Sequence, residues 1–369
     1  GLDIANVGTS DLFYLDISSP FNSEKLRWTN LAPIPVKSAI SPSCLGGSNN
    51  STIFLFEHRS TGNVNSSTLV IFTFDIINQQ WDALHTLGST PISRQNMDAV
   101  VDNNGIIYIN GGFDPYTTLK SSNNTNIFNS LSNSWLNNGL DAPIIRSAYT
   151  ATLLPSGLIL YIGGTQDFPN VTTTNYSLAE IDMNKISVYN TISGIWNLTM
   201  AVGAIDTRLS HTAVLSKDNS TIIIFGGGSN NFTKSPYPPL AALDTSVEPY
   251  KWSEIISSGN PRPLAYHSAQ TVGNYMIVAF GAFFSAGKGF DLATAPNNDV
   301  YILDTSSHKW VKSFDLSTIP NSPDISDEIK LAFGLGTNTD NHNYIATPGT
   351  NTDNHNYIAT PGTDNRERG

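Results

Sequence analysis

Short apolar runs recur along the chain, and their lengths and endings indicate strands rather than helices. Three runs rich in β-branched and aromatic residues end at paired glycines, over residues 106–112, 159–164 and 222–227. Residues 276–282 repeat the run and end on Gly281-Ala282. Runs of this length bounded by glycine are typical of buried strands. A glycine at the end of each run indicates a bent backbone, or one that lies close to a neighbour.

A second pattern follows each of these runs: an apolar stretch ends in Asp or Asn, and a tryptophan comes a few residues later. In four repeats the Asp or Asn precedes the tryptophan by six residues, which fits a tight turn between two strands. Asp and Asn suit such a turn because their side chains cap the turning backbone. The six tryptophans are spaced by 53, 54, 61, 56 and 58 residues: Trp28, Trp81, Trp135, Trp196, Trp252 and Trp310.

An opening strand preceded by a cation completes the repeat. The five cations are Lys37, Arg94, Arg146, Arg208 and Arg262. Four strands in each repeat of this length predict the blades of a β-propeller.

The paired glycines, the apolar residue before Asp or Asn, and the tryptophan together resemble kelch repeats. The resemblance covers residues 1–315, and the sequence is similar to the kelch proteins that fungi encode in large numbers. It implies an all-β fold: a six-bladed kelch-type β-propeller of four-stranded blades, related in fold to the propeller domain of galactose oxidase. A shared fold does not imply a shared activity.

The two ends of the chain modify this prediction. Gly1-Leu-Asp3 matches Gly112-Phe-Asp114, so the first blade is expected to be incomplete, leaving five full blades and a partial one. A link over 316–336 holds one candidate closing strand, at 328–334. The segment 337–369 repeats thirteen residues in tandem (338–350 and 351–363) with little apolar content, which predicts a disordered tail.

Composition excludes several classes of partner and site. The net charge is −11 and no basic run occurs, so we expect no nucleic-acid partner. The longest apolar runs are too short for a membrane-spanning helix. Cys44 is the only cysteine, which excludes an internal disulfide and a cysteine-rich zinc site. We interpret Cys44 as a small buried packing residue.

Nine asparagines lie in Asn-x-Ser/Thr triplets and are candidates for N-glycosylation. Each triplet alone is weak evidence, but together they favour an extracellular or cell-surface protein. The nine are Asn49, Asn50, Asn65, Asn123, Asn170, Asn175, Asn197, Asn219 and Asn231.

The candidate binding surface is the face that carries the long loops between second and third strands, over 58–68, 113–124, 165–185, 228–240 and 282–298. The five cations begin the innermost strands, so they are expected near the central channel on that face. One interpretation is a ring for a carboxylate or an acidic peptide. The alternative is structural, with each cation bonded to the carbonyls of the neighbouring link between blades.

Two histidines, His211 and His267, take equivalent places in consecutive repeats. They are candidates for ligand binding, but no third metal ligand accompanies them, so core histidines are the favoured interpretation.

Resemblance to galactose oxidase implies copper held by tyrosines and histidines, with one tyrosine linked to a cysteine. In this sequence Ile40 falls nearest the cysteine position, and Asn96 takes the place of the linked tyrosine. We therefore expect no catalysis, no cofactor and no metal. The predicted function is a non-catalytic extracellular scaffold for a protein, peptide or glycan. The alternatives are an oxidase relative without its cofactor residues and an intracellular kelch scaffold.

Overall fold

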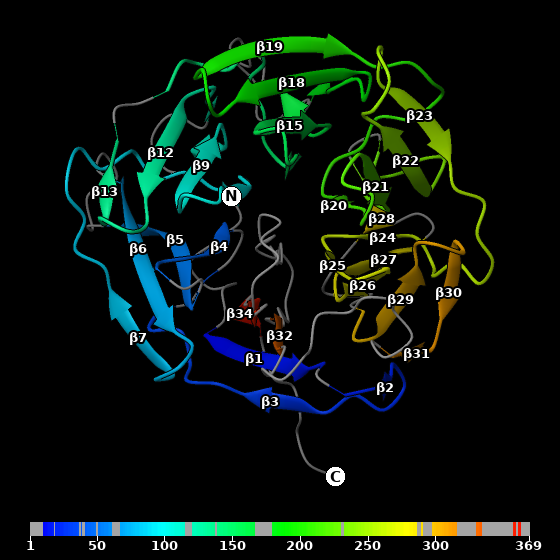
Figure 1. The fold of residues 1–369 in the computed structure, drawn as a ribbon, viewed down its shortest axis with the longest axis horizontal. Helices are drawn as coiled ribbons and strands as arrows, with labels where there is room; N and C mark the ends of the chain where they lie inside the picture. Colours follow the sequence, from blue (N-terminus) through cyan, green and yellow to red (C-terminus); the bar gives the residue numbers. More distant parts are fainter. Residues whose placement is uncertain are drawn as a thin grey trace.

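A computed structural model describes residues 10–17, 19–36, 38, 41–48, 51–60, 67–114, 120–136, 139–166, 179–229, 232–285, 289–290, 297–315, 330–333, 357–358 and 361–362. Within these residues the chain forms strands and turns and no helix. Figure 1 shows the sheets arranged as a ring round a common axis, with one edge of each sheet toward that axis. The predicted all-β propeller is confirmed.

Five antiparallel sheets have four strands each. We number them blades 2 to 6 in chain order, and each list runs along the chain. Blade 2 is β4 (Ser43–Gly46), β5 (Thr52–Ser60), β6 (Ser67–Asp75) and β7 (Gln80–Ala83); blade 3 is β8 (Ala99–Val101), β9 (Ile106–Asn110), β12 (Thr125–Asn129) and β13 (Ser134–Trp135); blade 4 is β14 (Thr150–Leu153), β15 (Leu158–Ile162), β18 (Lys185–Asn190) and β19 (Ile195–Met200); blade 5 is β20 (Thr212–Leu215), β21 (Thr221–Phe225), β22 (Leu240–Asp244) and β23 (Lys251–Glu254); blade 6 is β25 (Ser268–Val272), β26 (Tyr275–Ala279), β29 (Val300–Asp304) and β30 (Lys309–Val311).

The sheet between blades 6 and 2, which we name blade 1, is built differently. Its strand β1 (Asp11–Asp16) pairs with β3 (Trp28–Asn30) on one edge and with β32 (Lys330–Phe333) on the other. Two more short strands join it: β33 (Tyr357–Ile358) runs parallel to β32, and β34 (Pro361–Gly362) pairs with the start of β1. The strand predicted within 328–334 is therefore present.

The prediction of six blades is corrected to five four-stranded blades. Residues 10–30 supply only the two outer strands of the remaining sheet, β1 and β3, and short segments far along the chain pair with the rest of it. Apart from β32, β33 and β34, the predicted link at 316–336 and tail at 337–369 lie outside the described residues.

Turns between the third and fourth strands confirm the role expected of Asp and Asn. Oδ1 of Asp75 accepts hydrogen bonds from the backbone N–H groups of Ile77 and Asn78, at 2.9 and 3.0 Å. Asn129 and Asn190 cap their turns in the same way. These turns and those between the first and second strands define the tight-turn face.

Short hairpins mark the opposite face, the long-loop face, where they continue from the second strands. They are β10 (Phe113–Asp114) with β11 (Lys120–Ser121), β16 (Thr165–Gln166) with β17 (Ala179–Glu180), and β27 (Ala282–Ser285) with β28 (Gly289–Phe290) and β24 (Leu264–Ala265). A further pair, β2 (Phe21–Asn22) with β31 (Ser313–Phe314), joins the start of the chain to the end of blade 6. The long loops that hold these hairpins thus begin with residues whose backbone is paired to another strand.

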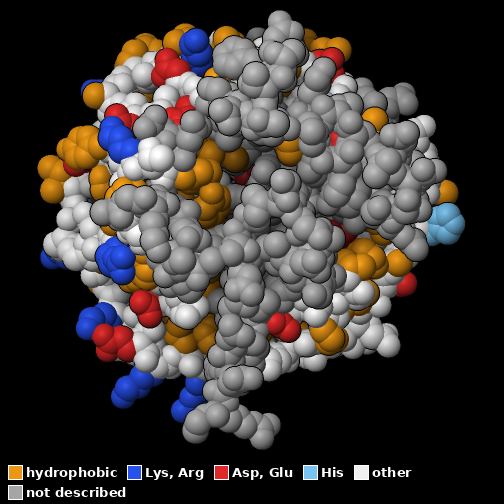
Figure 2. Space-filling model, turned by 180° about the vertical axis from the view of Figure 1, so that it is seen from behind, with side chains coloured by type: hydrophobic (Ala, Val, Ile, Leu, Met, Phe, Trp, Pro, Cys, Tyr) orange, Lys and Arg blue, Asp and Glu red, His pale blue; other side chains and the backbone are white. Residues whose placement is uncertain are grey.

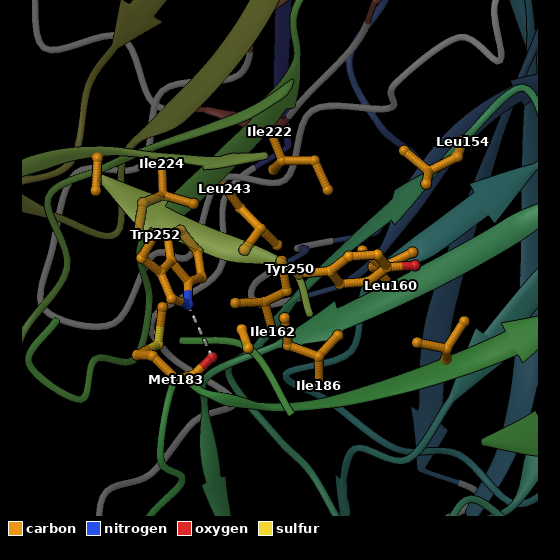
Figure 3. Close-up of a cluster of buried hydrophobic side chains, with 13 residues drawn as sticks. Leu154, Leu160, Ile162, Met183, Ile186, Ile222, Ile224, Leu243, Tyr250 and Trp252 are labelled. Carbon is orange, nitrogen blue, oxygen red and sulfur yellow. Dashed lines mark hydrogen bonds between the residues drawn. The ribbon is translucent and has the colours of Figure 1, made fainter. Parts of the chain in front are cut away.

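The hydrophobic core is a series of clusters between neighbouring blades. Figure 3 shows one of them, in which Leu160 and Ile162 of blade 4 pack against Ile222 and Ile224 of blade 5. The indole N–H of Trp252 donates to the carbonyl of Met183 in the preceding blade, at 3.3 Å. Trp196 and Trp81 likewise donate to Leu140 and Ala32. These three tryptophans therefore each form a hydrogen bond to the chain of the preceding blade.

No helix in the described part of the chain is long and apolar enough to cross a membrane.

Candidate binding face and the ring at its base

A ring of backbone hydrogen bonds joins the blades where the chain enters each innermost strand. Four residues form this inner belt, and all have positive φ: Asn96 (57°), Ala148 (53°), Ser210 (51°) and Tyr266 (59°). The N–H groups of Ala148, Ser210 and Tyr266 each donate to the carbonyl of the belt residue in the preceding blade, at 2.9 Å for Ala148 and 3.0 Å for the other two. Positive φ is unfavourable for residues other than glycine, so the surrounding fold must hold the belt in place.

The paired glycines fit against the next residue of the belt segment, which we call the wedge. The wedges are Met97, Tyr149, His211 and His267. A Cβ on the first glycine of blade 4, Gly163, would lie 2.8 Å from the ring of His211 in the next blade. A Cβ on the second, Gly164, would lie 2.9 Å from Cβ of Tyr149 in the same blade. His211 and His267 therefore each fill the space that two glycines leave, one on either side of a blade boundary, whereas Met97 and Tyr149 each lie against the second glycine of their own blade.

Blade 6 departs from this arrangement, and two alignments made from the sequence are wrong by one or two positions. Phe280, with φ of 62°, stands where the other blades have the first glycine, so the pair is Phe280-Gly281 and not Gly281-Ala282. Counting back from the wedge His267, the place of Arg146 and Arg208 is taken by Leu264, and not by Arg262. The guanidinium of Arg262 lies 4.3 Å from the centre of the Phe283 ring, a cation–π contact.

Arg146 and Arg208 are fully buried, each at 0% exposure. Arg146 donates from Nη1 to the carbonyl of Gly163 and from Nη2 to that of Lys185, both at 2.7 Å. Arg208 donates in the same way to Gly226 at 3.1 Å and to Pro238 at 2.8 Å. Each arginine thus bonds the end of the second strand to the start of the third strand or to the segment just before it. The role is structural, as in the alternative considered, but the carbonyls belong to the same blade and not to a link between blades.

Burial lowers the pKa of Arg146 to about 10 and that of Arg208 to about 9, so both stay charged at neutral pH. Arg94 is 6% exposed, and its Nη1 has no hydrogen-bond partner within the described residues. Lys37 lies outside those residues. The four described cations do not form an open ring, since Arg94, Arg146 and Arg208 are buried, and binding of an acidic ligand by the five cations stays a prediction.

His211 and His267 lie between blades as wedges. Nε2 of His211 is 3.1 Å from Oγ1 of Thr150, and Nε2 of His267 is 2.9 Å from Oγ1 of Thr212, each in the preceding blade. Burial holds the pKa of His211 well below its ordinary value and lowers that of His267 to about 3. Among the described residues, no three His, Cys, Asp or Glu side chains gather as a metal site.

Asp98 and Tyr149 connect blades 3 and 4 and were missed by sequence reasoning. The carboxylate of Asp98 accepts from the backbone N–H of Ala99 and of Ala151, both at 2.9 Å. The hydroxyl of Tyr149 donates to the carbonyl of Asn110. Burial raises the pKa of Asp98 to about 7. No repeat pattern marks Asp98, because the matching residues in blades 4 to 6 are Thr150, Thr212 and Ser268.

Aromatic side chains gather on the long-loop face between blades 5 and 6. Phe232 and Tyr266 stack with ring centres 4.7 Å apart, and both have positive φ, at 63° and 59°. Together with Phe284 they pack on Ala265 and Ala282. Figure 2 shows this face, with hydrophobic side chains on the half of the ring that carries β20 to β28. Bulky residues at positive φ are rare outside strained and functional sites, so this cluster is the best described candidate contact on the face.

Three of the nine glycosylation candidates are described. Asn197 on β19 and Asn219 in the β20–β21 turn are exposed, and Asn123 is half-buried, with its amide donating to the carbonyl of Ala142 at 3.2 Å. The other six lie outside the described residues: Asn49, Asn50, Asn65, Asn170, Asn175 and Asn231.

Cys44 lies on the innermost strand β4 and is 0% exposed, as expected for a packing residue. Burial raises the pKa of its thiol, so the thiol stays protonated. Asn96, at the position compared with the oxidase tyrosine, is a belt residue.

Comparison with family models agrees with the blade geometry. Residues 175–336 match the model of the KLHDC2/KLHL20/DRC7 kelch-repeats domain, a stretch that runs through blades 5 and 6 to β32. The match and the blade geometry together support a kelch-repeat β-propeller. Kelch propellers are typically non-catalytic scaffolds that bind proteins. No curated protein matches the chain in a sequence comparison. The likeness to galactose oxidase and to fungal kelch proteins stays a prediction.

Proposed function

We propose that this kelch propeller is an extracellular or cell-surface binding scaffold without catalytic activity, and that its long-loop face engages the partner. The observation that carries the proposal is the inner belt, because it fixes the base from which the long loops begin. Loops on a rigid base present a recognition surface at a small entropic cost of binding.

The aromatic cluster gives that surface a described contact point. Phe232 and Tyr266 are half-buried and stacked, so their rings are held before a partner arrives. Large aromatic side chains that lose little freedom on binding are common at the centres of protein interfaces. A protein or peptide partner is therefore favoured over a glycan.

The extracellular location rests on the nine glycosylation candidates. Asn197 and Asn219 are exposed and accessible to a glycosyltransferase in the folded protein. Mass spectrometry of protein from its native cells, after enzymatic release of N-glycans, should show deamidation at these asparagines. Unmodified asparagine at all nine positions would favour the intracellular scaffold instead.

The binding face is tested with a displayed library of random peptides, selected against the immobilised propeller. Peptides that bind wild type should lose affinity when Tyr266 and Phe232 are each changed to Ser. The matched control is Ile192→Ser, which changes an 84% exposed apolar residue on the tight-turn face. Equal losses in the control and in the face variants would contradict the long-loop face as the site.

A further inference from the structure

A cleft of about 830 Å³ opens between blades 2 and 3 on the tight-turn face, away from the surface proposed above. Three turns surround it: the β4–β5 turn with Gly47 and Ser48, the β6–β7 turn between Asp75 and Gln80, and the β12–β13 turn with Leu131 and Asn133. A volume of this size suits a small ligand or a side chain from a partner. All of its lining residues are described.

Strand register defines the wall that blade 2 contributes. Phe54, Thr73 and Asp82 face one another across β5, β6 and β7, and so do Thr52, Asp75 and Gln80 in the next row. Alternation places these six side chains on one side of the sheet. Trp81 stands on the other side, with its indole bonded to the carbonyl of Ala32 in the opposite direction. The wall therefore presents hydroxyl, amide and carboxylate groups above Phe54.

Comparison among blades explains why the cleft is open here. The residue that matches Thr73 is apolar in each of the other four-stranded blades: Ile127, Val188, Ala242 and Ile302. At the place of Asp82 those blades have Leu136, Asn197, Ser253 and Val311. Only blade 2 combines two polar residues, one of them charged, at these positions. Hydrophobic packing against blade 3 is therefore interrupted.

The lining determines which group the cleft can hold. Asp75 already accepts hydrogen bonds from its own turn, but the carboxylate of Asp82 has no hydrogen bond or ion pair within the described part of the chain. No Lys, Arg or His lines the cleft. Leu84 and Leu131, the latter 56% exposed, provide apolar contact beside the polar wall.

We propose that this cleft binds an arginine or lysine side chain of a partner protein. The apolar stem would lie along Leu84 and Leu131, and the cation would reach the carboxylate of Asp82 and the side-chain oxygens of Gln80 and Asn133. The net charge of −11 attracts a basic partner over a longer range. A saccharide fits less well, because sugars favour an exposed aromatic ring: of the two aromatic residues that line the cleft, Phe54 is 2% exposed, and the indole of Trp81 is bonded to Ala32 on the other side of the sheet.

The probe is a fluorescein-labelled Gly-Gly-Arg-Gly-Gly peptide, measured by fluorescence anisotropy at low salt, with a glutamine-centred peptide as the reference. Wild type should bind the arginine peptide more tightly than the reference. Asp82→Asn should weaken binding about fivefold, the size expected for a solvent-exposed ion pair. Thr73→Ile, which installs the residue of blades 3 and 6, should abolish binding while the melting temperature stays at or above that of wild type.

The control variant is Glu254→Gln, which removes one negative charge from the equivalent outer strand of blade 5 and should leave binding unchanged. Equal weakening by Glu254→Gln and Asp82→Asn would overturn the site, because it would reveal attraction by net charge alone. Equal affinity for the two peptides would also overturn it, as would binding of a neutral disaccharide that Asp82→Asn removes. Variants of Tyr266 leave this test unaffected, so the two proposed sites fail independently.

Discussion

Blade 5 and blade 1 lie on the two sides of blade 6, but their sheets are completed in different ways. Blade 5 uses four consecutive strands, and its glycine Gly226 makes room for the wedge of blade 6: a Cβ there would lie 2.7 Å from the ring of His267. At the border with blade 1 the same position is Phe280, whose ring packs on Phe13 and Trp28. The residue at this position is therefore set by what the next blade supplies, and not by the blade that contains it.

Removing the Phe280 ring should have the largest effect. Phe280 is 2% exposed and belongs to the cluster that joins blade 6 to blade 1. Phe280→Ala leaves a cavity there and should lower the free energy of unfolding by about 4 kcal/mol. Denaturant unfolding monitored by tryptophan fluorescence measures it. A loss below about 1 kcal/mol would mean that the cluster does not hold blade 1 in place.

The opposite change in blade 5 should be nearly as harmful. In Gly226→Ala the new Cβ would approach the carbonyl of Leu264 to 2.3 Å at a φ of 63°, so clash and backbone strain together should cost about 3 kcal/mol. Gly194→Ala is the matched control: φ is 69°, but the nearest atom would be the Tyr189 hydroxyl at 3.7 Å. The control should cost about 1 kcal/mol, from backbone strain alone. Equal costs for the two variants would refute the fit between glycine and wedge.

Acid should affect the blades with histidine wedges. The folded-state pKa of His211 and of His267 lies below the unfolded value, so the unfolded chain takes up protons first and stability falls as pH drops below about 6.5. Each histidine should contribute a loss of about 2 kcal/mol between pH 6.5 and 5. Asp98 acts in the other direction, because its raised pKa makes the fold bind a proton that the unfolded chain does not bind in this range.

Two variants separate these contributions in unfolding curves recorded at both pH values. His267→Met, which installs the wedge residue of blade 3, should reduce the acid loss, and Asp98→Asn should enlarge it. An acid loss that is the same in both variants and in wild type would show that these groups do not control it.

Opening the edge of blade 1 should have the smallest effect on the rest of the ring. Ending the chain after residue 329 removes β32, which pairs with β1 through four residue pairs, and β34, which pairs with the start of β1. Hydrogen exchange of amides in β1 should become about tenfold faster, which corresponds to a local loss of about 1.4 kcal/mol, while β21 in blade 5 keeps its protection. Uniform loss of protection would show that this strand stabilises the whole ring.

Much of this architecture was readable from the sequence because its determinants are local. Trp81, Trp196 and Trp252 and the turn residues Asp75, Asn129 and Asn190 repeat at regular spacing, and the structure gives each set one role. The register at Phe280 and Leu264 was missed, because it depends on which strand lies across a boundary. Residues on opposite sides of such a boundary are far apart in the sequence, and pattern analysis treats each repeat alone.

The candidate sites also divide into features with local determinants and features that depend on contacts between distant residues. Burial of Arg146 and Arg208 against carbonyls fits one of the two alternatives that the sequence left open. The stacking of Phe232 on Tyr266 and the cleft beside Asp82 could not be predicted, because both are formed by residues of different elements brought together by folding. A comparison of Thr73 with its apolar counterparts in the other repeats would have marked this position as unusual, but not the cleft itself.

The fit of His211 and of His267 between glycines of two consecutive blades also constrains how this part of the ring can change during evolution. A duplication or deletion that cuts the chain between two blades separates a wedge from one of its two glycines, unless the incoming neighbour carries a matching partner. Repeats can therefore be exchanged freely only among those with wedges of similar size. Mutation must therefore preserve the wedge of one blade together with the glycine of the blade before it.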